Sequence, residues 1–404
     1  MAFIKTRLTG TKTKSIVLLV VAELFTMSLW FLSSAVLPDM MREVELSSFI
    51  QALLSSSVNI GFVIGALLIA VFGIADRFDA RKIFALSAFF AAFFNYSLLF
   101  LELGGIASVL ARGLTGVCLA GVYPVGMKIA VGWGQKDRGF LVGLMVGALT
   151  VGSAFPHFAA YVGGMDWRFA VEVISLLSLI GGVLVLFCQL GPYDSRATKF
   201  QFSDIFLCWS NKYIRYPILG YLGHMWELYA MWAWLSTFAA LSFQMSMSEL
   251  DALRLSSLVS FSAIALGGLA CVFAGLFADK IGKSQVTIYA MGVSSVSALA
   301  TAFSFGGPVW ITVFFILMWG LSIIPDSAQF SALVADHTPA EKSGSILTLQ
   351  TALGFGLTII TVQGTPYLVA AIGWPITLGL MALGPLLGIY FMQKYLKLKL
   401  LNIH

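Results

Sequence analysis

The sequence predicts an all-α integral membrane protein with twelve transmembrane helices. Of its 404 residues, 59% are hydrophobic and only 11% are charged, whereas a soluble domain carries about 25% charged residues. The apolar runs are continuous and do not alternate with polar residues, which favours helices over the strands of a barrel. Charges and turn residues divide the runs into spans at 15–36, 49–72, 83–101, 105–126, 138–161, 168–190, 214–243, 255–277, 285–304, 308–334, 343–371 and 374–393.

The basic residues predict the orientation of these spans. With the N-terminus in the cytoplasm, twenty of the 24 lysines and arginines fall in cytoplasmic segments, and only Arg42, Arg168 and Arg254 fall outside. This asymmetry predicts cytoplasmic termini in a cell membrane, for which a bacterial inner membrane is expected. The first span is longer than a signal-peptide core, so we expect it to be retained. The formal charge of +5 follows from this asymmetry and does not indicate nucleic acid binding.

The longest cytoplasmic connection, residues 191–213, divides the chain into two parts with six spans each. We therefore expect an N-terminal six-helix bundle at 1–190 and a C-terminal six-helix bundle at 214–404. Two such bundles related by a pseudo-two-fold axis form the parallel-repeat design of many transporters.

A short motif occurs at corresponding places in the two parts. Asp76 and Arg77 follow the second span, and the second copy, after the eighth span, consists of Gly275, Asp279, Lys280, Gly282 and Lys283. This pattern resembles the cytoplasmic loop signature of the major facilitator superfamily, Gly-x-x-x-Asp-Arg/Lys-x-Gly-Arg/Lys. The first copy is degenerate, because Phe72 and Asp79 occupy its glycine positions.

Two further segments resemble motifs of the same family. Arg112 is followed by spaced glycines, as in the family's fourth helix, and Gly147, Gly152 and Pro156 loosely resemble the fifth-helix motif of its antiporters. The resemblance implies a major facilitator fold that exposes a central site alternately to the two sides. It also implies that Asp76, Arg77, Asp279 and Lys280 act in gating, since an acid at a helix end can pair with the neighbouring bundle.

Ionisable residues in the spans are the candidate functional groups, since they are costly in lipid and are usually functional. In the superfamily, the first, fourth, seventh and tenth helices line the central cavity, and these spans carry Glu23, Arg112, Glu227 and Asp326. The alternative is a structural carboxylate paired with a neighbour. The predicted substrate- or proton-binding residues are Glu23, Trp30, Arg112, Tyr123, His224, Glu227, Tyr229, Trp234, Asp326 and Gln350.

The depths of two of these residues predict a direct contact. At about 1.5 Å per residue, Arg112 lies roughly 10 Å below the outer boundary and Glu227 roughly 20 Å above the inner one. In a hydrocarbon core about 30 Å thick these depths coincide. We expect the pair to bridge the two bundles when the outer side is closed, either as a coupling element or as a static pair that offsets two burial costs.

These features predict a secondary active transporter, symporter or antiporter, for a small organic solute, with protons as the coupling ion. No Walker loop, catalytic Ser-His-Asp order or metal-binding helix motif stands out, so we expect no enzyme, cofactor or metal site. The four cysteines show no disulfide pattern. We expect a monomer whose partners are its solute, protons and the bilayer.

Several functional alternatives stay open at this point. The protein could be an exporter of an organic anion, drug or carboxylate siderophore rather than an importer, or a non-transporting receptor on the same fold. An intramembrane hydrolase or synthase is a third class. Three acids against one arginine would suit a cationic substrate, or proton sites around a neutral or anionic one.

Overall fold

The computed structural model describes residues 2–134, 137–164, 166–193, 205–339 and 342–401. Side chains at 2–9, 75–76, 205, 276, 279 and 343–345 lie outside this description. Within it, the regular elements are all helical, as expected. They are α1 (Ala2–Met27), α2 (Leu32–Glu43), α3 (Ser48–Phe72), α4 (Ile74–Arg77), α5 (Ala80–Tyr96), η1 (Ser97–Phe100), α6 (Ile106–Leu119), α7 (Tyr123–Val131), α8 (Arg138–Val162), α9 (Trp167–Leu186), α10 (Ile205–Ser210), α11 (Lys212–Phe243), α12 (Glu249–Ile281), α13 (Lys283–Phe303), α14 (Val309–Ile323), α15 (Ser327–Asp336), α16 (Ser343–Met381) and α17 (Leu383–Leu401).

The helices are consistent with twelve membrane crossings. Ten segments of the described chain are long and apolar enough to span a bilayer. The longest of them, Ile346–Leu401, holds two of the expected spans, because the backbone leaves helical geometry at Gly373 (φ 77°). The 32-residue helix α11 supplies the remaining crossing; it is interrupted by polar and aromatic side chains, which lower its hydropathy.

Besides the twelfth crossing, which passes from α16 to α17 at Ala382, three of the crossings are broken rather than continuous. The first is divided into α1 and α2, the fourth into α6 and α7, and the tenth into α14 and α15. Pro325 occupies the third break. A proline inside a predicted span indicates a kink in the helix, and the structure confirms this prediction. The first break, at residues 28–31, contains no proline, and the sequence did not predict it.

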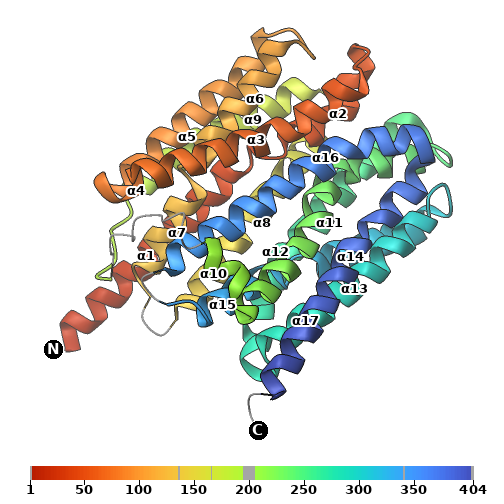
Figure 1. The fold of residues 1–404 in the computed structure, drawn as a ribbon. Helices are drawn as coiled ribbons and strands as arrows, with labels where there is room; N and C mark the ends of the chain where they lie inside the picture. The colour runs from red at the N-terminus through yellow and green to blue at the C-terminus, as the bar shows by residue number, and fades with distance from the viewer. Residues whose placement is uncertain (1, 135–136, 165, 194–204, 340–341, 402–404) are drawn as a thin grey trace.

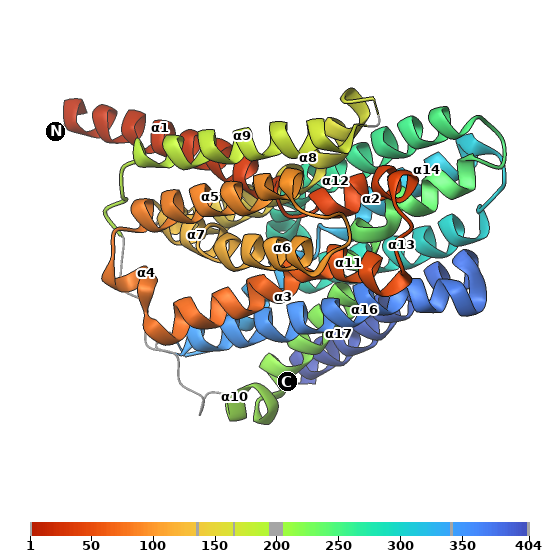
Figure 2. The same cartoon turned by 90° about the horizontal axis from the view of Figure 1, so that it is seen from above.

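The chain forms two halves, α1–α9 and α10–α17, which diverge toward one end of the molecule (Figure 1). We call that end the terminal face, because both chain termini lie there, and the other end the distal face. Helices α8 and α12 pack across the halves, as do α3 and α16, which run side by side in Figure 2. Gly147 and Gly268 permit the first contact, since a Cβ on Gly268 would lie 3.1 Å from the Gly147 carbonyl oxygen. The domain limits at 190 and 214 stay a prediction, and most of the linker lies outside the described residues.

Candidate functional site

A cavity of about 1100 Å³ lies between the two halves. Its lining begins near the terminal face at Asp137 and Lys283 and ends deep in the molecule at Phe62, Trp232 and Phe355. Both halves contribute to the wall, so a change in their relative tilt would change access to the cavity.

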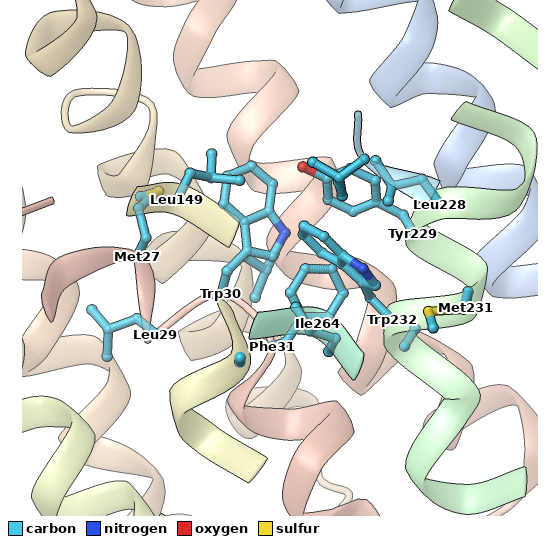
Figure 3. Packing of buried hydrophobic residues seen from close by; sticks show 14 of the residues in the cluster. Met27, Leu29, Trp30, Phe31, Leu149, Leu228, Tyr229, Met231, Trp232 and Ile264 are labelled. Atoms are coloured by element: carbon cyan, nitrogen blue, oxygen red, sulfur yellow. The ribbon is translucent and has the colours of Figure 1, made fainter. Parts of the chain in front are cut away.

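An aromatic cluster closes the deep end of this cavity. The Trp30 ring centroid lies 4.6 Å from that of Phe62, 5.5 Å from Phe355 and 5.8 Å from Tyr229. In Figure 3, Trp30 and Phe31 from the first half lie toward Tyr229 and Trp232 from the second. We call the cluster the aromatic plug; its members are Trp30, Phe31, Phe62, Tyr229, Trp232 and Phe355.

Polar contacts join the halves on the distal side of the plug. Trp30 Nε1 donates to Asn59 Oδ1 at 2.6 Å, and Asn59 Nδ2 donates to Thr358 Oγ1 at 3.3 Å. The Ser56 hydroxyl donates to Gln363 Oε1 at 2.8 Å. At the distal surface, Arg42 and Glu249 form an ion pair at 3.2 Å. The distal side of the cavity is therefore closed.

Two ion pairs of the described side chains near the terminal face each lie within one half. Lys12 Nζ lies 2.7 Å from Asp137 Oδ2, both in the first half. Lys283 Nζ lies 2.6 Å from Asp336 Oδ2, both in the second half. The Arg42–Glu249 pair, in contrast, joins the two halves at the distal face.

Arg112 holds the broken first crossing in place. Its Nη2 donates to the carbonyl oxygens of Leu29 at 2.8 Å and Trp30 at 2.9 Å, and its Nη1 donates to Asn95 Oδ1 at 2.6 Å. A helix break inside a membrane frees carbonyl groups that must find new donors, and Arg112 supplies them. Asn95 is itself fixed by a 2.8 Å hydrogen bond to Ser175.

The expected Arg112–Glu227 pair is therefore wrong for this conformation. Glu227 accepts a hydrogen bond from Ser294 Oγ at 2.7 Å and another from Trp319 Nε1 at 3.2 Å. Both donors belong to the second half, on α13 and α14. Arg112 and Glu227 thus each find their hydrogen-bond partners inside their own half.

A second pair of ionisable groups lies one helical turn away from Glu227. His224 Nδ1 is 2.9 Å from Asp326 Oδ1, at ion-pair distance but not aligned as a hydrogen bond. Both side chains are buried, and Asp326 follows the proline that breaks the tenth crossing. His224, Glu227 and Asp326, here called the second-half cluster, therefore connect α11 to this break.

Glu23 differs from these groups because its partners are missing. It is fully buried on α1, and neither carboxyl oxygen has a hydrogen-bond partner within the described chain. Its Oε2 lies close to the backbone of α7, where a Cβ on Gly126 would be 2.6 Å away. An unpaired buried carboxylate is costly when ionised, so a neutral, protonated Glu23 fits this environment better.

The other predicted site residues occupy different environments. Tyr123 and Tyr229 line the cavity, and Trp30 belongs to the plug. Trp234 Nε1 donates to the Val362 carbonyl oxygen at 3.0 Å, away from the cavity. Gln350 Nε2 donates to Ser331 Oγ at 3.4 Å, just behind the wall.

The five ionisable residues do not form the central polar site that the sequence suggested. Glu23, Arg112, His224, Glu227 and Asp326 all lie behind the described lining of the cavity. An amide inside an apolar run is a signal of interhelical hydrogen bonding. The sequence predicts such a bond for Asn59, which the structure confirms, whereas the sequence analysis missed Asn95.

Two of the four residues expected to act in gating have described side chains. The side chains of Asp76 and Asp279 lie outside the described residues, and Arg77 and Lys280 are exposed at the terminal face. Asp79, at a glycine position of the degenerate motif, caps α5 by accepting from Arg81 N at 2.9 Å. Its side-chain hydrogen bond with Arg81 lowers the pKa of Asp79. This residue thus acts as a helix cap within the first half.

A bundle of membrane-spanning helices in two halves, with a central cavity open to one face, defines the class of alternating-access membrane transporters. The family model of the Major Facilitator Superfamily matches residues 19–362. The chain belongs to this superfamily, as its loop and fourth-helix motifs indicated.

Individual relatives are more distant. The chain is 26% identical over 325 residues to the proton-coupled antiporter flippase LtaA of Staphylococcus haemolyticus, with 77% of each protein covered. The xylose transporter XylE from E. coli, in a partially occluded inward-open conformation, matches with a TM-score of 0.72 at 13% identity, covering 95% of this chain and 98% of that one. The nucleoside transporter NupG gives 0.70 at 14% identity, covering 95% and 99%. At these identities, the similarity to the two solved structures shows the fold alone.

Proposed function

We propose that this chain is a proton-coupled secondary active transporter that moves a small organic solute across the cell membrane by alternating access. The observation that carries the proposal is the cavity between the halves, which reaches the terminal face and is closed distally by the aromatic plug and the Arg42–Glu249 pair. The opposite state needs only a rocking of the halves about this site.

Proton coupling is supported by the composition of the second-half cluster. With His224 protonated and both acids ionised, the buried cluster carries a net charge of −1. Burying an uncompensated charge is costly, and one proton on Glu227 or Asp326 removes it. Because Asp326 adjoins the break between α14 and α15, such a proton would act where the tenth crossing can bend.

Movement of protons and solute in opposite directions is supported by the relative that is described as a proton-coupled antiporter flippase. We propose antiport, with protons entering the cytoplasm as the solute leaves it. The protein acts as a monomer in this proposal, because a single chain supplies both walls of the cavity.

A vesicle experiment tests this function. The purified protein is reconstituted into liposomes, and a solute panel is offered to inside-out and right-side-out vesicles under an imposed pH gradient. We expect accumulation in inside-out vesicles with an acidic lumen, together with proton release from the lumen, and none in protein-free liposomes. Binding of a solute without movement in either orientation would indicate a receptor instead.

The orientation in the membrane is a separate prediction. We propose that the terminal face is cytoplasmic, so the structure represents an inward-open state. On a cysteine-free background, Ser210→Cys on α10 should react with an impermeant maleimide only after cells are permeabilised, whereas the distal, exposed Glu45→Cys should react in intact cells. Labelling of Ser210→Cys in intact cells would reverse the assignment.

Asn59 offers a test of the distal closure. Asn59→Leu should weaken the link from Trp30 to Thr358 and favour opening of the distal side, since one hydrogen bond contributes about 1 kcal/mol, or roughly a five-fold shift. Electron–electron double resonance between spin labels at Glu45 and Asp251 would report a larger population of long distances. Gln51→Leu is the matched control, because this amide bonds to Leu46 O within the first half. An unchanged distance distribution in Asn59→Leu would show that the link does not hold the closed state.

A further inference from the structure

The polar groups that line the cavity lie mainly on one side. Its second-half wall carries hydroxyl and amide side chains on α15 and α16, which we call the neutral polar wall; they are Ser327, Gln329, Ser331, Thr348 and Thr351. The amide of Gln350 lies behind Ser331, and its buried Oε1 has no hydrogen-bond partner in the described chain. None of these side chains is charged.

The opposite wall is apolar where α3 and α8 form it, whereas α7 adds Tyr123 and Lys128. Helices α3 and α8 contribute Phe62, Ala66, Ile69, Val142, Val146 and Leu149, with Thr150 as the polar exception on these helices at this depth. The volume of about 1100 Å³ exceeds the usual 300–1,000 Å³ of a drug-sized ligand site. The cavity can therefore hold a solute with an apolar part and a separate polar part.

The positions of the charged side chains disfavour a solute that would place an ionised group in the deep part of the cavity. Glu227 accepts from two donors, Arg112 donates to three acceptors, and Asp326 is paired with His224. Glu23 has no hydrogen-bond partner in the described chain, but it is fully buried against α7. All five side chains lie outside the described lining of the cavity. The charged lining residues Lys128, Asp137 and Lys283 sit near the terminal face. A charge brought to the plug would lose its water without gaining a counterion.

We propose that the transported solute is an uncharged amphipathic molecule, whose apolar part packs against α3 and α8 and whose hydroxyl- or amide-bearing head bonds to the neutral polar wall. This inference rests on the proposed function and names its substrate class. A neutral polyhydroxyl head could belong to a soluble glycoside or to a glycolipid, and the same chemistry would bind both.

Equilibrium dialysis of the protein in nanodiscs, against empty nanodiscs, tests the head group directly. The probes share one aromatic ring: 4-nitrophenyl glucoside and galactoside are neutral, 4-nitrophenyl phosphate is anionic and 4-nitrobenzyl trimethylammonium is cationic. Free glucose tests the need for the apolar part. We expect at least one neutral glycoside to bind ten-fold or more tightly than the charged probes and free glucose. A neutral glycolipid, offered in vesicles, is the membrane-borne alternative; binding of this lipid alone would assign the solute to the bilayer.

Variants connect the binding to the wall. Gln329→Leu combined with Thr351→Val should weaken glycoside or glycolipid binding at least five-fold. Thr365→Val is the matched control on α16, because that hydroxyl bonds to Thr361 O of its own helix and does not line the cavity. Three outcomes would overturn the inference. A charged probe could bind as tightly as the neutral ones or more tightly, no neutral probe could bind, or the double variant could keep its affinity. Because dialysis needs no gradient, these outcomes are separate from a failure of proton-driven transport.

Discussion

Glu227→Gln is expected to abolish proton-driven accumulation of the solute while leaving solute exchange intact. Glutamine keeps the shape of the side chain, and its carbonyl oxygen can still accept from Ser294 or Trp319. It mimics the protonated acid permanently, so the second-half cluster can no longer take up and release a proton at this position. The loss of uphill transport should be ten-fold or more, measured in vesicles with and without a pH gradient.

The control for this substitution is Glu102→Gln, which removes an exposed carboxylate and should leave accumulation unchanged. Downhill exchange of labelled solute in the Glu227→Gln protein shows that the variant is folded and able to change its access. If the Glu227→Gln protein still concentrates solute with an unaltered pH dependence, Glu227 is not the coupling group. Glu23, which has no hydrogen-bond partner in the described chain, and Asp326 would then be tested in turn.

Arg112→Met should cause a large loss of both thermal stability and transport. The substitution removes the donors to Leu29 O, Trp30 O and Asn95 Oδ1, and each buried acceptor left unpaired costs about 1–3 kcal/mol. The segment at 28–31 carries Trp30 and Phe31 of the aromatic plug, so its release should also loosen the distal closure. The midpoint of thermal denaturation, read from tryptophan fluorescence in detergent, and transport in vesicles measure the two effects.

Two further variants separate this positioning role from simple loss of charge. Arg112→Lys keeps the charge but not the planar guanidinium group that reaches three acceptors. Its thermal stability and transport should therefore lie between those of the unmodified protein and those of Arg112→Met. Arg168→Met removes an exposed pair with Glu43, formed at 2.7 and 2.9 Å, and should cost at most about 1 kcal/mol. Full transport and unchanged stability in Arg112→Met would show that the break in the first crossing does not depend on this residue.

The sequence alone determined the class of fold. Hydrophobicity, span length and the repeated loop motif predicted a bundle of twelve crossings in two halves, because each crossing must satisfy its backbone within itself and cover about 30 Å of hydrocarbon. The break at Pro325 followed from the same local chemistry. These features depend on composition and on residues that are close together in the sequence. They can therefore be predicted without the three-dimensional structure.

The pairing of buried groups was decided by the tertiary structure. Helical rise gave Arg112 and Glu227 similar depths, but depth does not fix how a helix is rotated about its axis or how far its half is tilted. The rotation and tilt in the tertiary structure placed Arg112 against the carbonyls of the broken first crossing and Glu227 against Ser294 and Trp319. The break at 28–31 was unpredictable for the same reason: its freed carbonyls are tolerated only because a donor from another helix, Arg112, reaches them.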